Sequence, residues 1–477
     1  MTNFAGLDSP FWLALGRSVL VGVIVAGLSL GIGWPLGVRV GLTTFPWRRF
    51  LLALLALPLL LPSFLVAIGL STLWRGLGGV TAVVWAFACL GVPLVSFAAL
   101  AATLTLTRGQ ADAARLAGRS ASSLSACCDL KILTRADESS AVLGERHLFR
   151  LALRAAFPLA GLAAALAGAL TLADPGPGQI FGWPGAASEL LTSFAARYDR
   201  ALATRQALAL AVVAALIAWP LAWKLAPEVA AGLFARDVNR PSPVRASATT
   251  VWVFGAASLS TLFPLAGLLR PLITKPWPVA RAWSEVVRTG TDTLLYAALA
   301  ASIAVAVAFA LVWVVGCSAG PRRWLVAAAV ALLALPPALP ALWLVPWSGR
   351  MTLGIALALR GLPLAILLAL RAVGSMPPSW ADAARVHRVP RVTFLARAAL
   401  PWCARWAFPA AAIAALLATA EVGTVLLLHP PGHGSLPLAV FTIMANAPEA
   451  LVAVLCLFYL ALALALAVTG QQIIRRL

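Results

Sequence analysis

The sequence predicts an all-α polytopic membrane protein with about eleven transmembrane helices, arranged as two tandem five-span halves and a linking span. Of its 477 residues, 62% are hydrophobic and only 11% are charged, and the mean hydropathy is +0.94. A soluble domain of this size cannot bury so much apolar surface. Runs of about 20 apolar residues recur along the chain, and each can cross a bilayer as a helix. A polar motif, Ala-Asp-Ala-Ala-Arg, occurs at 111–115 and again at 381–385.

The apolar runs divide into two blocks around a polar linker at 226–250, which bears prolines and charges. The expected spans are 18–38, 51–74, 79–106, 157–173, 206–225, 251–272, 293–316, 325–347, 352–373, 401–420 and 451–468. They predict a first half at 1–225, a linker with an extra span at 226–292, and a second half at 293–477.

Prolines interrupt several spans. Pro58 and Pro62 in the second span have counterparts in Pro336, Pro337 and Pro340 in the eighth. Proline removes a helical hydrogen bond, and a bilayer tolerates this where neighbouring helices or a water-lined path satisfy the freed carbonyls. For one proline, a kinked helix lining a pathway and an ordinary packing irregularity are equally good explanations. Their equivalent places in the two halves favour the pathway.

Basic residues predict the orientation and explain the net charge of +20. About 25 of them fall in the loops on the side of the two Ala-Asp-Ala-Ala-Arg copies, and about nine on the other side. The positive-inside rule places those loops in the cytoplasm, the N-terminus outside and the C-terminus inside. No separate polar domain carries a basic patch, so the expected partner is the lipid bilayer and not nucleic acid.

The spacing of the two copies of the polar motif indicates a duplication. The shift between copies is 270 residues at Ala111 and Ala381, and 243 residues at the following prolines, Pro158 and Pro401. The first half therefore carries 27 more residues, at about 119–146. This insertion either enlarges a docking surface, spoils coupling on that side, or reflects an error in the reading of the gene.

Each copy suits a short helix across the cytoplasmic ends of the spans. Two adjacent alanines allow close backbone approach, and an acid followed by an arginine suits the helix dipole. Two such helices match two copies of a symmetric partner. An amphipathic helix that rests on the membrane is the alternative.

These loops resemble those of the permease subunits of binding-protein-dependent ABC importers, whose motif is Glu-Ala-Ala-x-x-x-Gly. The matching stretches are 112–118 and 382–388, and the segments 173–185 and 421–432 resemble the fused, two-half permeases of the iron(III) and thiamine type. Both copies have aspartate in place of the family's glutamate. Arg388 replaces the glycine, so that turn lacks the residue that adopts positive φ without cost.

The resemblance implies ATPase-coupling loops at 108–157 and 374–400, and it implies two copies of an ABC ATPase and an extracytoplasmic solute-binding protein as partners. The implied coupling residues are Asp112, Ala113, Ala114, Arg115, Gly118, Asp382, Ala383, Ala384 and Arg385. The chain lacks the Gly-x-x-x-x-Gly-Lys-Ser/Thr loop, so the ATPase would be a separate polypeptide. The implied location is the cell inner membrane, and the solute stays open between iron(III), thiamine and a polyamine.

Two acids are candidates for the solute pathway. Asp174 and Glu421 each follow the span after a coupling loop, and acids at membrane depth are functional suspects because their burial is costly. Alternatively, each covers a broken helix end or pairs with an arginine. Arg360, inside a span, snorkels, pairs with an acid or faces the pathway.

The sequence predicts a transporter and not an enzyme, without a cofactor or a bound metal. No His, Asp and Glu cluster supports catalysis, and the six cysteines show no CxxC spacing. An ion-coupled secondary transporter, also built from repeats, is the alternative function.

Overall fold

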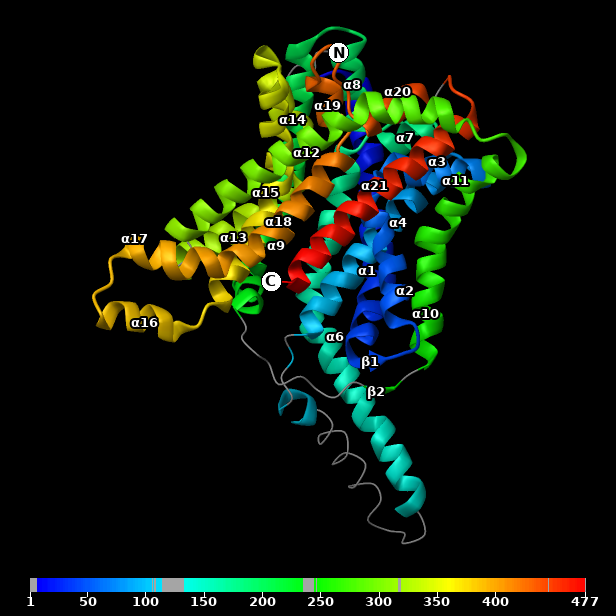
Figure 1. Cartoon of the computed structure of the whole chain (residues 1–477). Helices are drawn as coiled ribbons and strands as arrows, with labels where there is room; N and C mark the ends of the chain where they lie inside the picture. Colours follow the sequence, from blue (N-terminus) through cyan, green and yellow to red (C-terminus); the bar gives the residue numbers. More distant parts are fainter. Residues whose placement is uncertain are drawn as a thin grey trace.

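Nine helices in the described part of the chain are long and apolar enough to cross a membrane, and two bent helix pairs raise the number to eleven (Figure 1). This computed structural model describes residues 7–104, 106, 109–113, 133–234, 244–245, 247–315, 319–444 and 446–476. Large apolar side chains such as Leu13, Val23 and Leu216 point outward from the bundle, as expected of a surface that faces lipid. The protein is a multi-pass helical membrane protein, and each of the eleven expected spans matches one helix or one bent pair.

The first block of helices is built around α1. Its elements are α1 (Ser9–Leu42), α2 (Arg48–Ala56), η2 (Leu57–Leu60), α3 (Ser63–Leu73), α4 (Gly79–Thr103), α6 (Leu133–Ala173), α7 (Gly176–Ile180), α8 (Ala186–Ala195) and α9 (Arg200–Phe234). Helix α1 packs against α4 and α6. The contact with α4 is close because a Cβ atom on Gly37 would lie 2.1 Å from the backbone oxygen of Ser96.

The linking span is α10 (Ser247–Ala257), the π-helical η3 (Ser258–Leu262) and α11 (Phe263–Thr274). The second block is built around α12, which packs against α15 and α18. Its elements are α12 (Val279–Val315), α13 (Ala319–Ala334), α14 (Ala338–Leu344), η4 (Val345–Trp347), α15 (Arg350–Ser375), α16 (Pro378–Val386), α17 (Arg391–Phe394), η5 (Leu395–Ala399), α18 (Leu400–Ala420), α19 (Gly423–Leu428), α20 (Leu436–Ile443) and α21 (Glu449–Arg476). Two short strands, β1 (Thr43–Thr44) and β2 (Val244–Arg245), pair in parallel.

Two spans are sharply broken where the sequence has its paired prolines. The chain turns by 105° between 48–60 and 63–73, next to Pro62. It turns by 85° between 320–334 and 338–347, at Pro336 and Pro337. None of these prolines has a backbone N–H to continue the helix, so each break lies where the hydrogen-bond ladder fails. Pro93 and Pro363, in contrast, lie inside unbroken helices.

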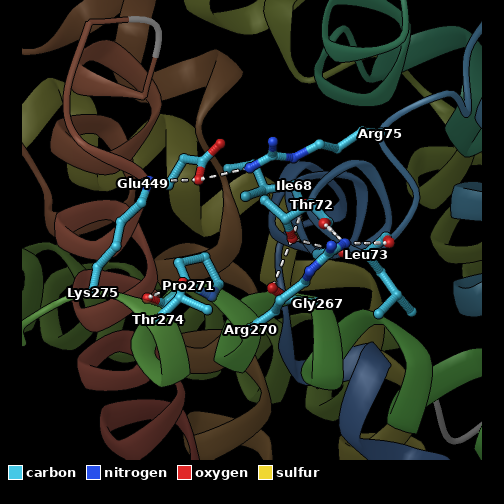
Figure 2. Close-up of polar contacts among 11 residues, drawn as sticks. Ile68, Thr72, Leu73, Arg75, Gly267, Arg270, Pro271, Thr274, Lys275 and Glu449 are labelled. Atoms are coloured by element: carbon cyan, nitrogen blue, oxygen red, sulfur yellow. Dashed lines mark hydrogen bonds and ion pairs between the residues drawn. The ribbon is translucent and has the colours of Figure 1, made fainter.

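Helix α11 is held against α3 and α21 by polar contacts, shown in Figure 2. The Thr72 hydroxyl donates to the Gly267 carbonyl at 2.7 Å, and the Arg270 guanidinium donates to the Thr72 and Leu73 carbonyls at 2.9 and 2.7 Å. Arg270 thus satisfies carbonyls that the end of α3 leaves without helical partners. Glu449, at the start of α21, accepts from Lys275 at 2.9 Å.

Two helices begin well before the spans that they carry. The fourth span was expected over 157–173, after a long loop, but α6 begins at Leu133 and continues unbroken past Pro158 (Figure 1). The residues before Phe157 include many good helix formers, and they extend the helix beyond the apolar run because propensity and not hydropathy sets its start. The same happens in the second block, where helix precedes the expected start at Pro401 from Arg391 onward. About half of the expected insertion at 119–146 is therefore helix, and its residues 119–132 lie outside the described part.

Candidate functional site

Four interruptions of helices meet at one cavity between the two blocks. The cavity has a volume of about 470 Å³. From the first block it is lined by Pro62 and Ser63 at the break before α3, and by Asp174 between α6 and α7. From the second block it is lined by Pro337 at the break before α14, and by Glu421 between α18 and α19. Discontinuous helices that face one cavity are the usual scaffold of a solute site at membrane depth.

Asp174 lies at the end of α6 and holds three elements together. The Ser63 hydroxyl donates to its Oδ2 atom, and the Gly176 amide, the first of α7, donates to Oδ1 at 2.9 Å. Gly176 allows this tight turn, because a Cβ atom there would lie 2.8 Å from the Cβ of Phe64. Both hydrogen-bond donors to Asp174 are neutral groups.

Glu421 lies at the corresponding end of α18 but has a cationic partner. The Thr424 amide in α19 donates to its Oε1 at 3.3 Å, and the Arg360 Nε atom lies 3.8 Å from its Oε2. Arg360 also donates to the carbonyl of Leu333, near the end of α13, at 3.0 Å. The side chains of Arg360 and Glu421 are only 16% and 13% exposed, so this pair is largely removed from solvent.

Cavity lining, helix capping and pairing with an arginine are the alternatives that the sequence leaves open for these acids, and the geometry combines them. Both carboxylates accept hydrogen bonds from the amide end of a short helix, and both line the cavity. Snorkelling, pairing with an acid and facing the pathway are the alternatives for Arg360. It pairs with Glu421, and it lines the same cavity. Their part in solute passage stays a prediction.

The rest of the cavity wall is apolar. Three aromatic rings, those of Phe64, Phe87 and Phe441, are the largest side chains on it. Phe64 and Phe441 come from opposite blocks and meet edge to face, with ring centroids 5.5 Å apart. The sequence offered no signal for these rings, because an apolar residue at helical spacing looks the same whether it faces a cavity or a neighbouring helix.

The second coupling sequence forms an exposed helix that stands away from the bundle (Figure 1). Asp382 and Arg385 lie on α16, with Oδ1 3.6 Å from the guanidinium and side chains 68% and 83% exposed. Trp380 attaches α16 to the bundle by an edge-to-face contact with Trp402, at 5.2 Å between centroids. Trp402 in turn donates to the Ala372 carbonyl at 3.3 Å. The sequence offers no signal for this tryptophan pair, because its members lie 22 positions apart.

The turn after α16 has the left-handed backbone conformation that glycine favours, although arginine stands at this position. Arg388 has φ 50°, in the left-handed region. The Val389 amide donates to the Ala384 carbonyl at 2.8 Å and the Arg388 amide to the Arg385 carbonyl at 3.1 Å, which closes the helix end. Arginine at this position costs about 1 kcal/mol relative to glycine.

The first coupling sequence is described only in part. Asp112 and Ala113 lie in the helical segment 109–113 and are exposed, while Ala111 is buried. Ala114, Arg115 and Gly118 lie outside the described residues.

Among the residues that the structure describes, no group of three or more His, Cys, Asp or Glu side chains could hold a metal ion. Comparison with protein-family models and with curated protein sequences gives no match to this chain.

Proposed function

We propose that this chain is the transmembrane permease subunit of an ATP-driven ABC importer and supplies the solute pathway. The observation that carries the proposal is the cavity at which four helix interruptions from two blocks meet, with Asp174, Glu421 and Arg360 on its wall. A helix broken at membrane depth leaves backbone groups without partners, and such breaks occur where the backbone lines a cavity or is buried in protein.

The proposal includes two tandem halves. In each block the first long helix packs against the third and fourth, as α1 does against α4 and α6 and α12 does against α15 and α18. In each, the second span is the broken one, and the fourth ends at the acid, followed by two short helices. The same order of unusual features in both blocks favours duplication.

The proposal places the ATPase at the end of the molecule where α16 projects. The start of α6 and the β1–β2 pair lie at that end, while α7, α8, α19 and α20 lie at the opposite end (Figure 1). The loops on the α16 side are the basic ones, which favours a cytoplasmic location for that side. The cell inner membrane is part of the proposal because the resemblance to importer permeases implies it. A solute-binding protein would dock at the opposite end.

The test is co-purification with the ABC ATPase encoded nearest to this chain. Asp382→Lys reverses a charge on the exposed face of α16 and should abolish or strongly weaken the association. Glu228→Lys is the matched control, because it reverses an exposed acid on α9, outside α16. Equal loss in both variants, or none in Asp382→Lys, would move the contact elsewhere. No association in wild type, together with uptake driven by an ion gradient, would replace the proposal with a secondary transporter.

A further inference from the structure

We infer that the cavity binds an organic cation with one positive charge and an apolar body, and that the carboxylate of Asp174 holds the charge. This inference rests on the proposed function, because it names the class of solute that the pathway would take.

The charges on the cavity wall do not balance. Arg360 is within ion-pair distance of Glu421, and it also donates to the Leu333 carbonyl. Asp174 accepts only from the Ser63 hydroxyl and the Gly176 amide, and no basic side chain in the described part of the chain forms an ion pair with it. With both acids ionised, the wall carries two negative charges and one positive charge. One negative charge is left in excess, and Asp174 is the acid without a basic side chain within ion-pair distance.

The helix ends around the cavity add to the negative charge of its wall. Helices α6 and α18 end at Ala173 and Ala420, and both residues line the cavity. Carbonyl ends of helices carry partial negative charge and favour cations. The amide ends of α7 and α19 are covered by the two carboxylates themselves. A cation in the cavity therefore meets both the Asp174 carboxylate and the carbonyl ends of two long helices.

The apolar wall limits what kind of cation fits. Leucines and the rings of Phe64, Phe87 and Phe441 make up most of the surface, and aromatic faces attract desolvated organic cations. A bare metal ion needs several oxygen ligands, and the described residues include no cluster of three or more His, Cys, Asp or Glu side chains that could hold one. A polyamine brings several charges, whereas one uncompensated carboxylate matches one charge. An anion would meet Asp174 unfavourably.

The first experiment measures binding of tritiated benzyltrimethylammonium to the purified full chain in lipid nanodiscs, without an ATPase. We expect saturable binding that unlabelled benzyltrimethylammonium displaces. Its neutral and anionic analogues, phenethyl alcohol and 3-phenylpropionate, should not displace it. Non-saturable binding, or equal competition by the anion, would overturn the inference.

Three variants test the charge balance by sign. Asp174→Asn should weaken binding about tenfold, as should Glu421→Gln, which leaves the Arg360 charge without its partner. Arg360→Met should strengthen it, because it adds a net negative charge to the cavity. Glu449→Gln, an exposed acid outside the cavity, is the control and should leave binding unchanged.

A merely structural role for these residues predicts a different pattern. In that case Arg360→Met would weaken binding as much as Asp174→Asn, and the inference would be wrong. If Asp174→Asn fails to fold, the Arg360→Met variant and the competitor series on wild type still test whether the cavity selects a cation. Failure here with intact ATPase association refutes only the solute class, and cation binding without ATPase association refutes only the importer.

Discussion

Replacing Gly267 by alanine should destabilise the protein by separating α11 from α3. The new Cβ atom would lie 1.7 Å from the Gly69 carbonyl oxygen and 2.6 Å from its carbon. Both contacts are with backbone atoms, so no side-chain rotation relieves them. Ordinary contact needs about 3.5 Å, so the helices must move apart by about 1.5 to 2 Å.

The size of the effect follows from what that movement breaks. The Thr72 hydroxyl loses the Gly267 carbonyl, and Arg270 loses its two carbonyls at the end of α3 (Figure 2). Overpacking costs about 1 to 3 kcal/mol, and each lost hydrogen bond adds about 0.5 to 1.5 kcal/mol. Because the helices relax in part, we expect a loss of about 2 to 4 kcal/mol in the free energy of unfolding.

Thermal unfolding of the purified protein in detergent measures this loss. We expect Gly267→Ala to lower the Tm by about 2 to 4 °C. The control is Gly255→Ala in the same span, where an added Cβ meets nothing within 4 Å. Ser63 at the start of α3 holds Asp174, so Gly267→Ala should also weaken cation binding in the cavity. Equal Tm values for the two variants would refute the close packing of α11 on α3.

Three further predictions concern the helix ends. Arg388→Gly removes the cost of the left-handed turn, and hydrogen exchange at the Val389 amide should slow by about fivefold; unchanged exchange would contradict that geometry. Trp380→Ala removes the ring contact with Trp402, so exchange should quicken across α16 and stay constant in α15. Glu449→Gln removes an exposed ion pair with Lys275, and because such pairs contribute little, the Tm should fall by less than about 2 °C; a larger fall would mean that this pair anchors α21.

Much of the fold was predictable because each feature is local in sequence. Hydropathy over about 20 residues locates every span, and the prolines at 62 and 336–337 mark both sharp bends. Asp174 and Glu421 were predictable as special positions, since each is an acid directly after an apolar run. The starts of helices outside the apolar runs were not predictable. In a polar stretch, hydropathy no longer distinguishes a helix such as α6 from a loop.

The contacts across the cavity were not predictable because they join distant residues. Arg360 and Glu421 lie 61 positions apart, and nothing in either neighbourhood selects the other. The aromatic contact of Phe64 with Phe441 and the glycine contact of α3 with α11 have the same origin. One sequence suggests the parts of the site, and only the packing of the two blocks shows that they face one cavity.

Capping alone does not account for a charged residue at position 174. The amide end of a short helix is satisfied equally well by serine, threonine or asparagine, which avoid the cost of placing a charge at membrane depth. Glu421 offsets that cost with Arg360, while Asp174 has only the Ser63 hydroxyl and the Gly176 amide. Capping of α7 therefore does not require a charged side chain at position 174. The positively charged solute that we infer for the cavity would give that carboxylate its missing partner.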